Sequence, residues 1–258
     1  MAIRRFREHV SDQNWFAVAI DLAIVVIGVF LGIQASNWNQ GRLDSAKGET
    51  YRAMLVADVQ DNQQNIAMRM AYFRHVRKES AAALEELEKP VAALDEQFLI
   101  HAYQASQSIP WAMKRTTYDQ IMSSGAMNDV GDEALQDHIA NYYFAETVAA
   151  KFLGATTPYR DRARRIIPYR VQERIRSACP EKLGVDRKGA PLPAWTEKCV
   201  LNLPDSIVRP AIERIYRSEG LKEDLTLSLV DVDLKLTSLE RAKQSAAAFQ
   251  RVLEDDER

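Results

Sequence analysis

The side chains best suited to chemistry are dispersed along this chain, and their spacing matches no familiar catalytic or metal site. The four histidines, His9, His75, His101 and His138, form no H-x-x-x-H or H-E-x-x-H pair. No G-x-S-x-G nucleophile motif occurs, and no ligands cluster as zinc requires. The sequence therefore predicts no cofactor, no metal and no enzymatic activity, although two carboxylates that meet in the fold could still do acid–base work.

The densest run of charge is basic and lies between Pro158 and Arg176. Its leading arginines are Arg160, Arg162, Arg164 and Arg165. Guanidinium groups at this density could bind an anion, such as a lipid head group or an acidic partner. The favoured alternative is internal pairing with acidic residues of the last predicted helix. Those residues are Glu223, Asp224, Asp231 and Asp233.

The two cysteines lie at the ends of a proline-rich segment, 177–205, which reads as a surface loop between helices. In an oxidising compartment Cys179 and Cys199 would form a disulfide that closes this loop. Closing a loop of about 20 residues contributes on the order of 3 kcal/mol. The alternative is two free, buried thiols. We predict the disulfide, on condition that this part of the chain lies outside the cytoplasm.

The longest apolar run, WFAVAIDLAIVVIGVFLGI, begins at Trp15 and contains one charge. As a helix it spans roughly 28 Å, which is close to the hydrocarbon thickness of a bilayer. Trp15 and Trp38 bracket the run as interface anchors would. We predict a transmembrane helix at 15–35, in preference to a buried core helix or a cleaved signal peptide.

Orientation follows from the basic residues that flank this predicted span. Arg4, Arg5 and Arg7 precede it, whereas only Arg42 and Lys47 follow closely. The positive-inside rule then predicts a short cytoplasmic segment, 1–14, in the inner membrane of a bacterium. The periplasmic domain would cover 40–253, followed by an acidic tail at 254–258.

One face of the predicted span carries features that favour helix packing. Asp21, Gly28 and Gly32 fall on this face, and the two glycines form a G-x-x-x-G step that allows close approach of a second helix. The partner could be a second copy of this chain or another transmembrane protein. The alternative is that Asp21 reaches toward the nearby membrane surface and that the glycines are incidental.

Two motifs resemble those of a family of uncharacterised bacterial single-pass membrane proteins. The first comprises DLAIVVIG at 21–28, Gln34, Asn-Trp-Asn at 37–39 and Arg42. The second comprises Ser-Ser-Gly at 123–125, Asn128 and Asn-Tyr-Tyr at 141–143. The chain departs from the family in having Asp21 where glutamate is usual and Gly32 where alanine is usual. The resemblance implies the single-pass topology and no activity.

The remaining sequence predicts an all-α fold, an antiparallel helical bundle with long first and last helices. Helical periodicity runs over 43–89, with a possible break at Gly48, and further helices are expected at 91–107, 116–124, 132–153 and 221–253. Two short helices are expected within 160–176. The last helix carries a coiled-coil-like seam that ends before Lys243. The seam residues are Leu225, Leu229, Val232, Leu236 and Leu239.

The composition excludes some classes of protein but does not by itself indicate a function. The chain has 258 residues, of which 47% are hydrophobic, and a net charge of −2. It is therefore neither disordered nor a nucleic-acid binder. The features together favour protein–protein interaction, as a scaffold or as an accessory subunit of a membrane complex. The alternative is an extracytoplasmic ligand-sensing domain that signals through a partner protein.

Overall fold

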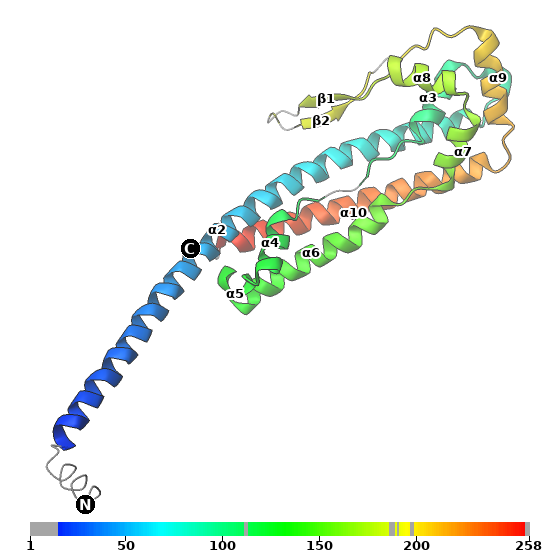
Figure 1. Ribbon diagram of the computed structural model, residues 1–258. Helices are drawn as coiled ribbons and strands as arrows, with labels where there is room; N and C mark the ends of the chain where they lie inside the picture. Colours follow the sequence, from blue (N-terminus) through cyan, green and yellow to red (C-terminus); the bar gives the residue numbers. More distant parts are fainter. Residues whose placement is uncertain (1–14, 111–112, 186–188, 190, 197–198, 256–258) are drawn as a thin grey trace, which may run out of the picture.

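The structure is a computed structural model that describes residues 15–110, 113–185, 189, 191–196 and 199–255. The predicted cytoplasmic segment 1–14 and residues 256–258 of the predicted tail lie outside these ranges. The described elements are α2 (Trp15–Glu86), η1 (Val91–Ala93), α3 (Glu96–Gln104), α4 (Thr116–Ser124), α5 (Met127–Val130), α6 (Glu133–Gly154), α7 (Pro158–Ile166), α8 (Tyr169–Ala178), β1 (Lys182–Val185), β2 (Pro191–Ala194), α9 (Asp205–Tyr216) and α10 (Leu221–Asp255). The all-α class is confirmed, with one two-stranded hairpin added (Figure 1).

A single unbroken helix, α2, organises the molecule and is 72 residues long. Its first part projects alone, and its second part forms one side of the bundle (Figure 1). The possible break at Gly48 does not occur. The glycine instead permits close packing, because a Cβ at this position would overlap the carbonyl oxygen of Asp129 in α5. Lys47 holds the same junction through an ion pair with Asp129 at 2.9 Å.

We expect Gly48→Ala to destabilise the bundle. Alanine is the better helix former by about 1 kcal/mol, but its methyl group would push α5 away, and such overpacking costs about 1–3 kcal/mol. Gly41→Ala is the matched control, because nothing lies within 4 Å of a Cβ built there. The melting temperature should fall by several degrees for Gly48→Ala and stay level or rise for Gly41→Ala. Equal melting temperatures for the two variants would contradict the close packing.

The long helices α2 and α10 lie antiparallel and form the most extensive helix pair of the described residues. Polar contacts show the direction, since residue numbers rise along α2 as they fall along α10. Gln63 contacts Gln250 (2.8 Å), Arg77 contacts Asp233 (2.6 Å), and Glu88, just after α2, contacts Lys222. The antiparallel pairing expected from the sequence is therefore present.

The predicted seam of α10 is confirmed at three of its five positions, and the buried face is longer than predicted. Leu225, Val232 and Leu239 are buried, but Ser228 and Lys235 occupy the buried positions that Leu229 and Leu236 were expected to fill. The buried positions alternate four and three apart over the whole helix. They are Leu221, Leu225, Ser228, Val232, Lys235, Leu239, Ala242, Ala246, Phe249 and Leu253. The seam passes Lys243 because that residue points to solvent.

Lys235 can occupy a seam position because its charge is satisfied there. Its ammonium group pairs with Asp231 at 2.8 Å and donates to the carbonyl oxygen of Ala155, just after α6. A buried charge is tolerated only with such partners. A hydrophobic pattern alone therefore could not identify this position as part of the core.

The shorter helices follow their capping residues. Asp95 accepts from the backbone of Gln97 at 2.8 Å and starts α3, so the expected helix 91–107 is divided into η1 and α3. The expected ends at Gly125 (φ +69°) and Asp132 are confirmed. The loop 177–205 contains the hairpin β1–β2, which was not expected, because its short strands contain glycine and proline.

Two apolar cores lie along the bundle. One is formed by α2, α4, α6 and α10 beside the projecting helix, with Leu55, Ile66 and Ile139 at its centre. The other lies at the distal end among α3, α7, α8 and α9, with Phe98, Tyr159 and Ile212 buried. The distal core carries the hairpin and the arginine-rich helices.

Candidate functional site

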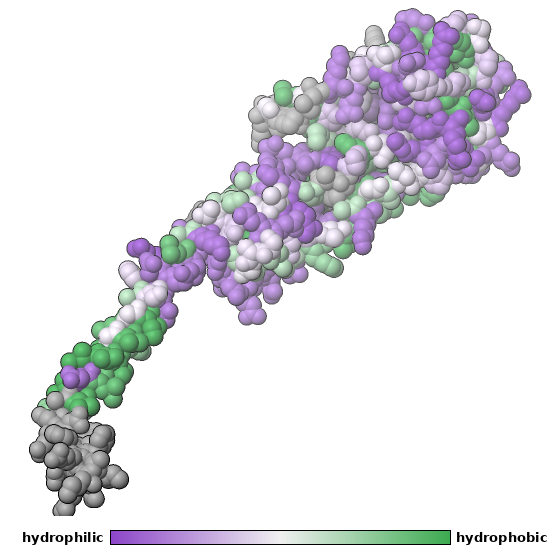
Figure 2. Space-filling model, in the orientation of Figure 1, coloured by the Kyte–Doolittle hydropathy of each residue, from purple (hydrophilic) through white to green (hydrophobic). Residues whose placement is uncertain are grey.

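The projecting part of α2 is the most apolar surface of the described residues. One 18-residue window within it has a mean hydropathy of 2.4, and none of this window is buried. Figure 2 shows a mainly hydrophobic surface over the portion of this part far from the bundle, with one hydrophilic spot, a mixed surface nearer the bundle, and a mostly hydrophilic bundle. By length and composition it is the one described helix able to cross a membrane.

The proposed packing face of this helix points away from the bundle. Gly28 and Gly32 lie about 160–200° around the helix from Gly48, where α5 packs. Nothing lies within 4 Å of a Cβ built at either glycine, and Asp21 is exposed. A second helix could therefore approach this face without meeting the bundle.

Of the two predicted interface anchors, the structure describes the side chain of Trp38 only. Trp38 is 71% exposed, and the guanidinium group of Arg42 lies 5.5 Å from the centre of its ring. Trp15 is the first residue of α2, but its side chain is outside the described set. The arrangement at Trp38 suits an aromatic residue at a membrane surface.

The arginine-rich stretch forms α7 and α8. Among its four leading arginines, only Arg162 pairs with one of the acidic residues that the sequence suggested. Arg162 pairs with Asp224 at 2.5 Å. Arg165 donates to the carbonyl oxygen of Asp161, and Arg160 to that of Ser106. Among the expected partners, Asp231 pairs instead with Lys235 and Asp233 with Arg77.

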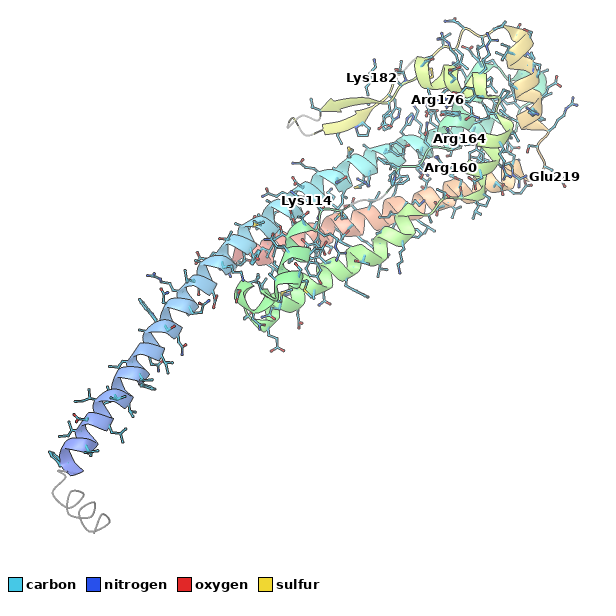
Figure 3. All side chains as sticks on the ribbon, viewed as in Figure 1. Lys114, Arg160, Arg164, Arg176, Lys182 and Glu219 are labelled. Atoms are coloured by element: carbon cyan, nitrogen blue, oxygen red, sulfur yellow. A yellow bond between two sulfur atoms is a disulfide. The ribbon has the colours of Figure 1, made fainter. Side chains whose placement is uncertain are left out.

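Arg164 and Arg176 converge on one buried tyrosine, Tyr103. The guanidinium group of Arg164 lies 4.0 Å from the ring centre, and Arg176 donates to the hydroxyl at 3.3 Å. Arg164 also donates to Ser106 Oγ at 2.8 Å and to Gln107 Oε1 at 3.1 Å. Burial lowers the pKa of Arg164. In Figure 3, Lys182, Arg176, Arg164 and Arg160 follow one another from the base of the hairpin toward α10.

A cavity of about 300 Å³, the hairpin pocket, lies beside this cluster. It is bounded by α2, α3, the end of α8 and the hairpin segment. Its main lining residues are Tyr72, Tyr103, Gln104, Arg176, Glu181 and Trp195. Burial raises the pKa of the Glu181 carboxyl at its edge. Sequence reasoning missed this pocket, because its walls come from segments more than 100 residues apart.

The disulfide between Cys179 and Cys199 holds the base of the hairpin, with their Cα atoms 5.5 Å apart. Cys199 is further fixed by its carbonyl oxygen, which accepts from the side chain of Gln97 at 2.9 Å. Trp195 and Glu181 both lie within the segment that the disulfide closes. The predicted pairing therefore also positions one wall of the hairpin pocket.

Two histidines that look isolated in the sequence meet at one carboxylate in the structure. His101 Nδ1 lies 2.7 Å from Glu79, and His75 Nδ1 lies 3.8 Å from it. The hydrogen bond to Glu79 raises the pKa of His101, whereas burial lowers that of His75. His75 also stacks on Trp195, with ring centres 4.1 Å apart. Neither these side chains nor any other three or more His, Cys, Asp or Glu residues in the described ranges are arranged to hold a metal ion.

A second cavity of about 300 Å³, the α6–α10 groove, is mainly apolar and more open. Val148 and Phe152 form its α6 side, and Ala242 lies on its α10 side. Glu146 lines the groove and is 6% exposed, and its Oε2 has no hydrogen-bond partner among the described residues. Burial raises the pKa of Glu146 to about 7. Arg241 also lines the groove but forms no described ion pair with Glu146.

An apolar stripe extends this groove along α10. Leu227, Val230 and Leu234 are each about half exposed and continue the face that holds Ser238 and Arg241. Phe144 adds a largely exposed ring on α6. Apolar side chains grouped in this way on a soluble surface are typical of a protein contact.

No protein family, curated protein or solved structure matches this chain. The resemblance to single-pass membrane proteins therefore stays a prediction. Function has to be argued from the exposed apolar helix, the α6–α10 groove and the hairpin pocket.

Proposed function

We propose that this chain is a single-pass membrane protein whose helical domain serves protein–protein interaction, as a scaffold or as an accessory subunit of a membrane complex. The observation that carries the proposal is α2, which continues without a break from an exposed apolar span into the core of the bundle. An apolar helix left bare in water would aggregate, so a bilayer is its natural surrounding. The unbroken helix then fixes the domain relative to the membrane.

In this proposal the N-terminus is cytoplasmic and the domain lies in the periplasm of a bacterium. The basic residues ahead of the span favour this orientation. The disulfide between Cys179 and Cys199 also favours it, because such bonds persist mainly in oxidising compartments.

Two surfaces are available to partners. The Asp21, Gly28 and Gly32 face would bind a second transmembrane helix, from another copy or another protein, on the side away from the bundle. The α6–α10 groove would bind an apolar segment of a partner that carries a basic side chain. Such a side chain would supply the charge partner that the buried carboxyl of Glu146 lacks.

Gly28→Leu should weaken the association between transmembrane helices about tenfold or more, because leucine prevents the close approach that glycine allows. The fold of the protomer should not change, since nothing packs against Gly28 within it. The measurement is the fraction of complex that survives in mild detergent, read by native electrophoresis and by co-purification from membranes.

Ala23→Leu is the matched control for this experiment. It places the same side chain in the same span, but about 220° around the helix from Gly28. If Gly28→Leu leaves every membrane complex intact, or if both variants weaken it equally, the proposed packing face is wrong.

Ligand sensing is the second candidate function, and the hairpin pocket is the observation that favours it. The pocket lies in the distal half of the bundle, between the long helix α2 and a segment closed by a disulfide. In this candidate function the signal from the pocket passes to a partner protein.

A further inference from the structure

The arginines around Tyr103 carry charge that the described protein does not neutralise. Arg160, Arg164 and Arg176 have hydrogen bonds to oxygen atoms of uncharged groups only, and no carboxylate lies within 4 Å of their nitrogen atoms in the described ranges. Like charges held close together repel, and the repulsion is stronger where burial lowers the dielectric constant. By contrast Arg162, which lies two residues from Arg160 and two from Arg164 on α7, pairs with the carboxylate of Asp224. No carboxylate of the described residues is therefore paired directly with this cluster, although Glu181 lines the adjacent hairpin pocket.

The hairpin pocket lies where such an anion could bind. Arg176 lines it directly, and Arg164 contacts Tyr103, which forms part of the same wall. Two further polar groups face it from buried side chains. Tyr72 is 5% exposed and Gln104 is 6% exposed. The Tyr72 hydroxyl and the Gln104 amide nitrogen have no hydrogen-bond partner in the part of the chain that the structure describes, so both can donate to a ligand.

Part of the lining of the hairpin pocket is flat and aromatic. Trp195 stacks on His75 with an angle of 13° between the rings, and Tyr72 lies 6.1 Å from Trp195. A flat ligand body could stack there. Glu181 at the edge would disfavour a second negative group on the ligand. The volume of about 300 Å³ is at the lower end of the range for small-molecule sites.

We propose that the hairpin pocket binds a small organic acid with one carboxylate and a flat body. The carboxylate accepts hydrogen bonds from Arg176 and from the Tyr72 hydroxyl, and the positive field of Arg160 and Arg164 adds to its binding. The flat body lies against Trp195. This site is independent of the proposed membrane association, which involves the opposite end of α2.

The test uses the full-length protein in detergent micelles, with benzoate as probe, benzamide as its uncharged counterpart and inorganic phosphate as an anion without a flat body. Binding is followed by titration calorimetry and by the melting temperature. We expect saturable binding of benzoate that raises the melting temperature. Benzamide and phosphate should each bind at least tenfold more weakly.

Arg176→Gln should weaken benzoate binding at least tenfold. Arg176 is exposed on α8, so the Arg176→Gln protein should still fold, with only a small change in melting temperature from the lost hydrogen bond to Tyr103. Arg170→Gln is the matched control, because it removes the same charge from an exposed position on the same helix. Circular dichroism of both variants confirms that they fold.

Three results would overturn the proposal. They are an absence of saturable benzoate binding, equal binding of benzamide or phosphate, and an equal effect of Arg176→Gln and Arg170→Gln. None of them affects the proposed packing of the transmembrane helix, which is tested separately at Gly28.

Discussion

Replacing Glu146 by glutamine should raise the melting temperature at pH 8 and leave it nearly unchanged at pH 5. Glu146 is buried against the α6–α10 groove, and burial raises the pKa of its carboxyl from 4.5 to about 7. At pH 8 the native protein must hold a buried, unpartnered carboxylate. Glutamine keeps the shape of the side chain and removes the charge.

The sign of the pH dependence follows from proton linkage. Between pH 4.5 and 7 the folded state holds the Glu146 proton while the unfolded state has released it. The contribution of Glu146 to stability is therefore fully present below about pH 4.5 and is lost as the pH rises through 7. The total change is on the order of 3 kcal/mol, or about 6–12 °C in melting temperature for a domain of this size.

Asp137→Asn is the matched control, because it removes an exposed carboxylate from the same helix. The wild-type protein and this variant should share one pH profile of melting temperature between pH 4 and 8, and Glu146→Gln should show a flatter one. Parallel profiles for all three proteins would show that Glu146 is solvated rather than buried. Binding of a basic partner segment to the groove should remove the difference at pH 8.

Removing the disulfide should also lower the stability of the protein substantially. The double variant Cys179→Ser, Cys199→Ser releases a loop of about 20 residues and should cost on the order of 3 kcal/mol in the chain-entropy model. The loss should be greatest at the distal end, because both cysteines are buried in the distal core. Proteolysis within the hairpin segment should accelerate, while hydrogen exchange at the α2–α10 seam should change little.

The reactivity of the same two cysteines tests whether the helical domain lies in the periplasm. In intact cells treated with a thiol-blocking reagent before lysis, a periplasmic domain should show no reactive cysteine until a reductant is added. Two thiols that react without reduction would contradict both the disulfide and the proposed orientation. The single variant Cys199→Ser provides the reference for one free thiol.

Helical periodicity was sufficient to predict α2, α6 and α10, because each buries apolar residues at regular spacing over many turns. Two buried positions of α10 were not predictable, because Ser228 and Lys235 are polar. The charge of Lys235 is satisfied by Asp231 and by the carbonyl oxygen of Ala155, and a hydrophobic pattern does not encode these contacts. The cap residues Asp132 and Gly125 marked helix ends correctly, since capping is a local interaction. The hairpin gave no alternating pattern and was missed.

The sites were harder to predict than the helices. The cysteine pair followed from its place at the two ends of a proline-rich loop. The grouping of Arg164 and Arg176 on Tyr103 joins α7 and α8 to α3, about 60–70 residues earlier, and no local pattern encodes that contact. Glu146 resembles any helical glutamate in the sequence, because only the packing of α10 and α6 makes it buried.

The unbroken helix α2 also sets the distance of each surface from the membrane. If Trp38 marks the membrane surface, His75 beside the hairpin pocket stands about 55 Å above it, at 1.5 Å per residue. The groove at Glu146 lies nearer the membrane, because α6 starts beside α5, which packs on α2 at Gly48, and from there runs antiparallel to α10 (Figure 1). Each surface therefore lies at a fixed distance from the membrane. A partner anchored in the same bilayer could contact either surface only if its own contact residues lay at the same distance.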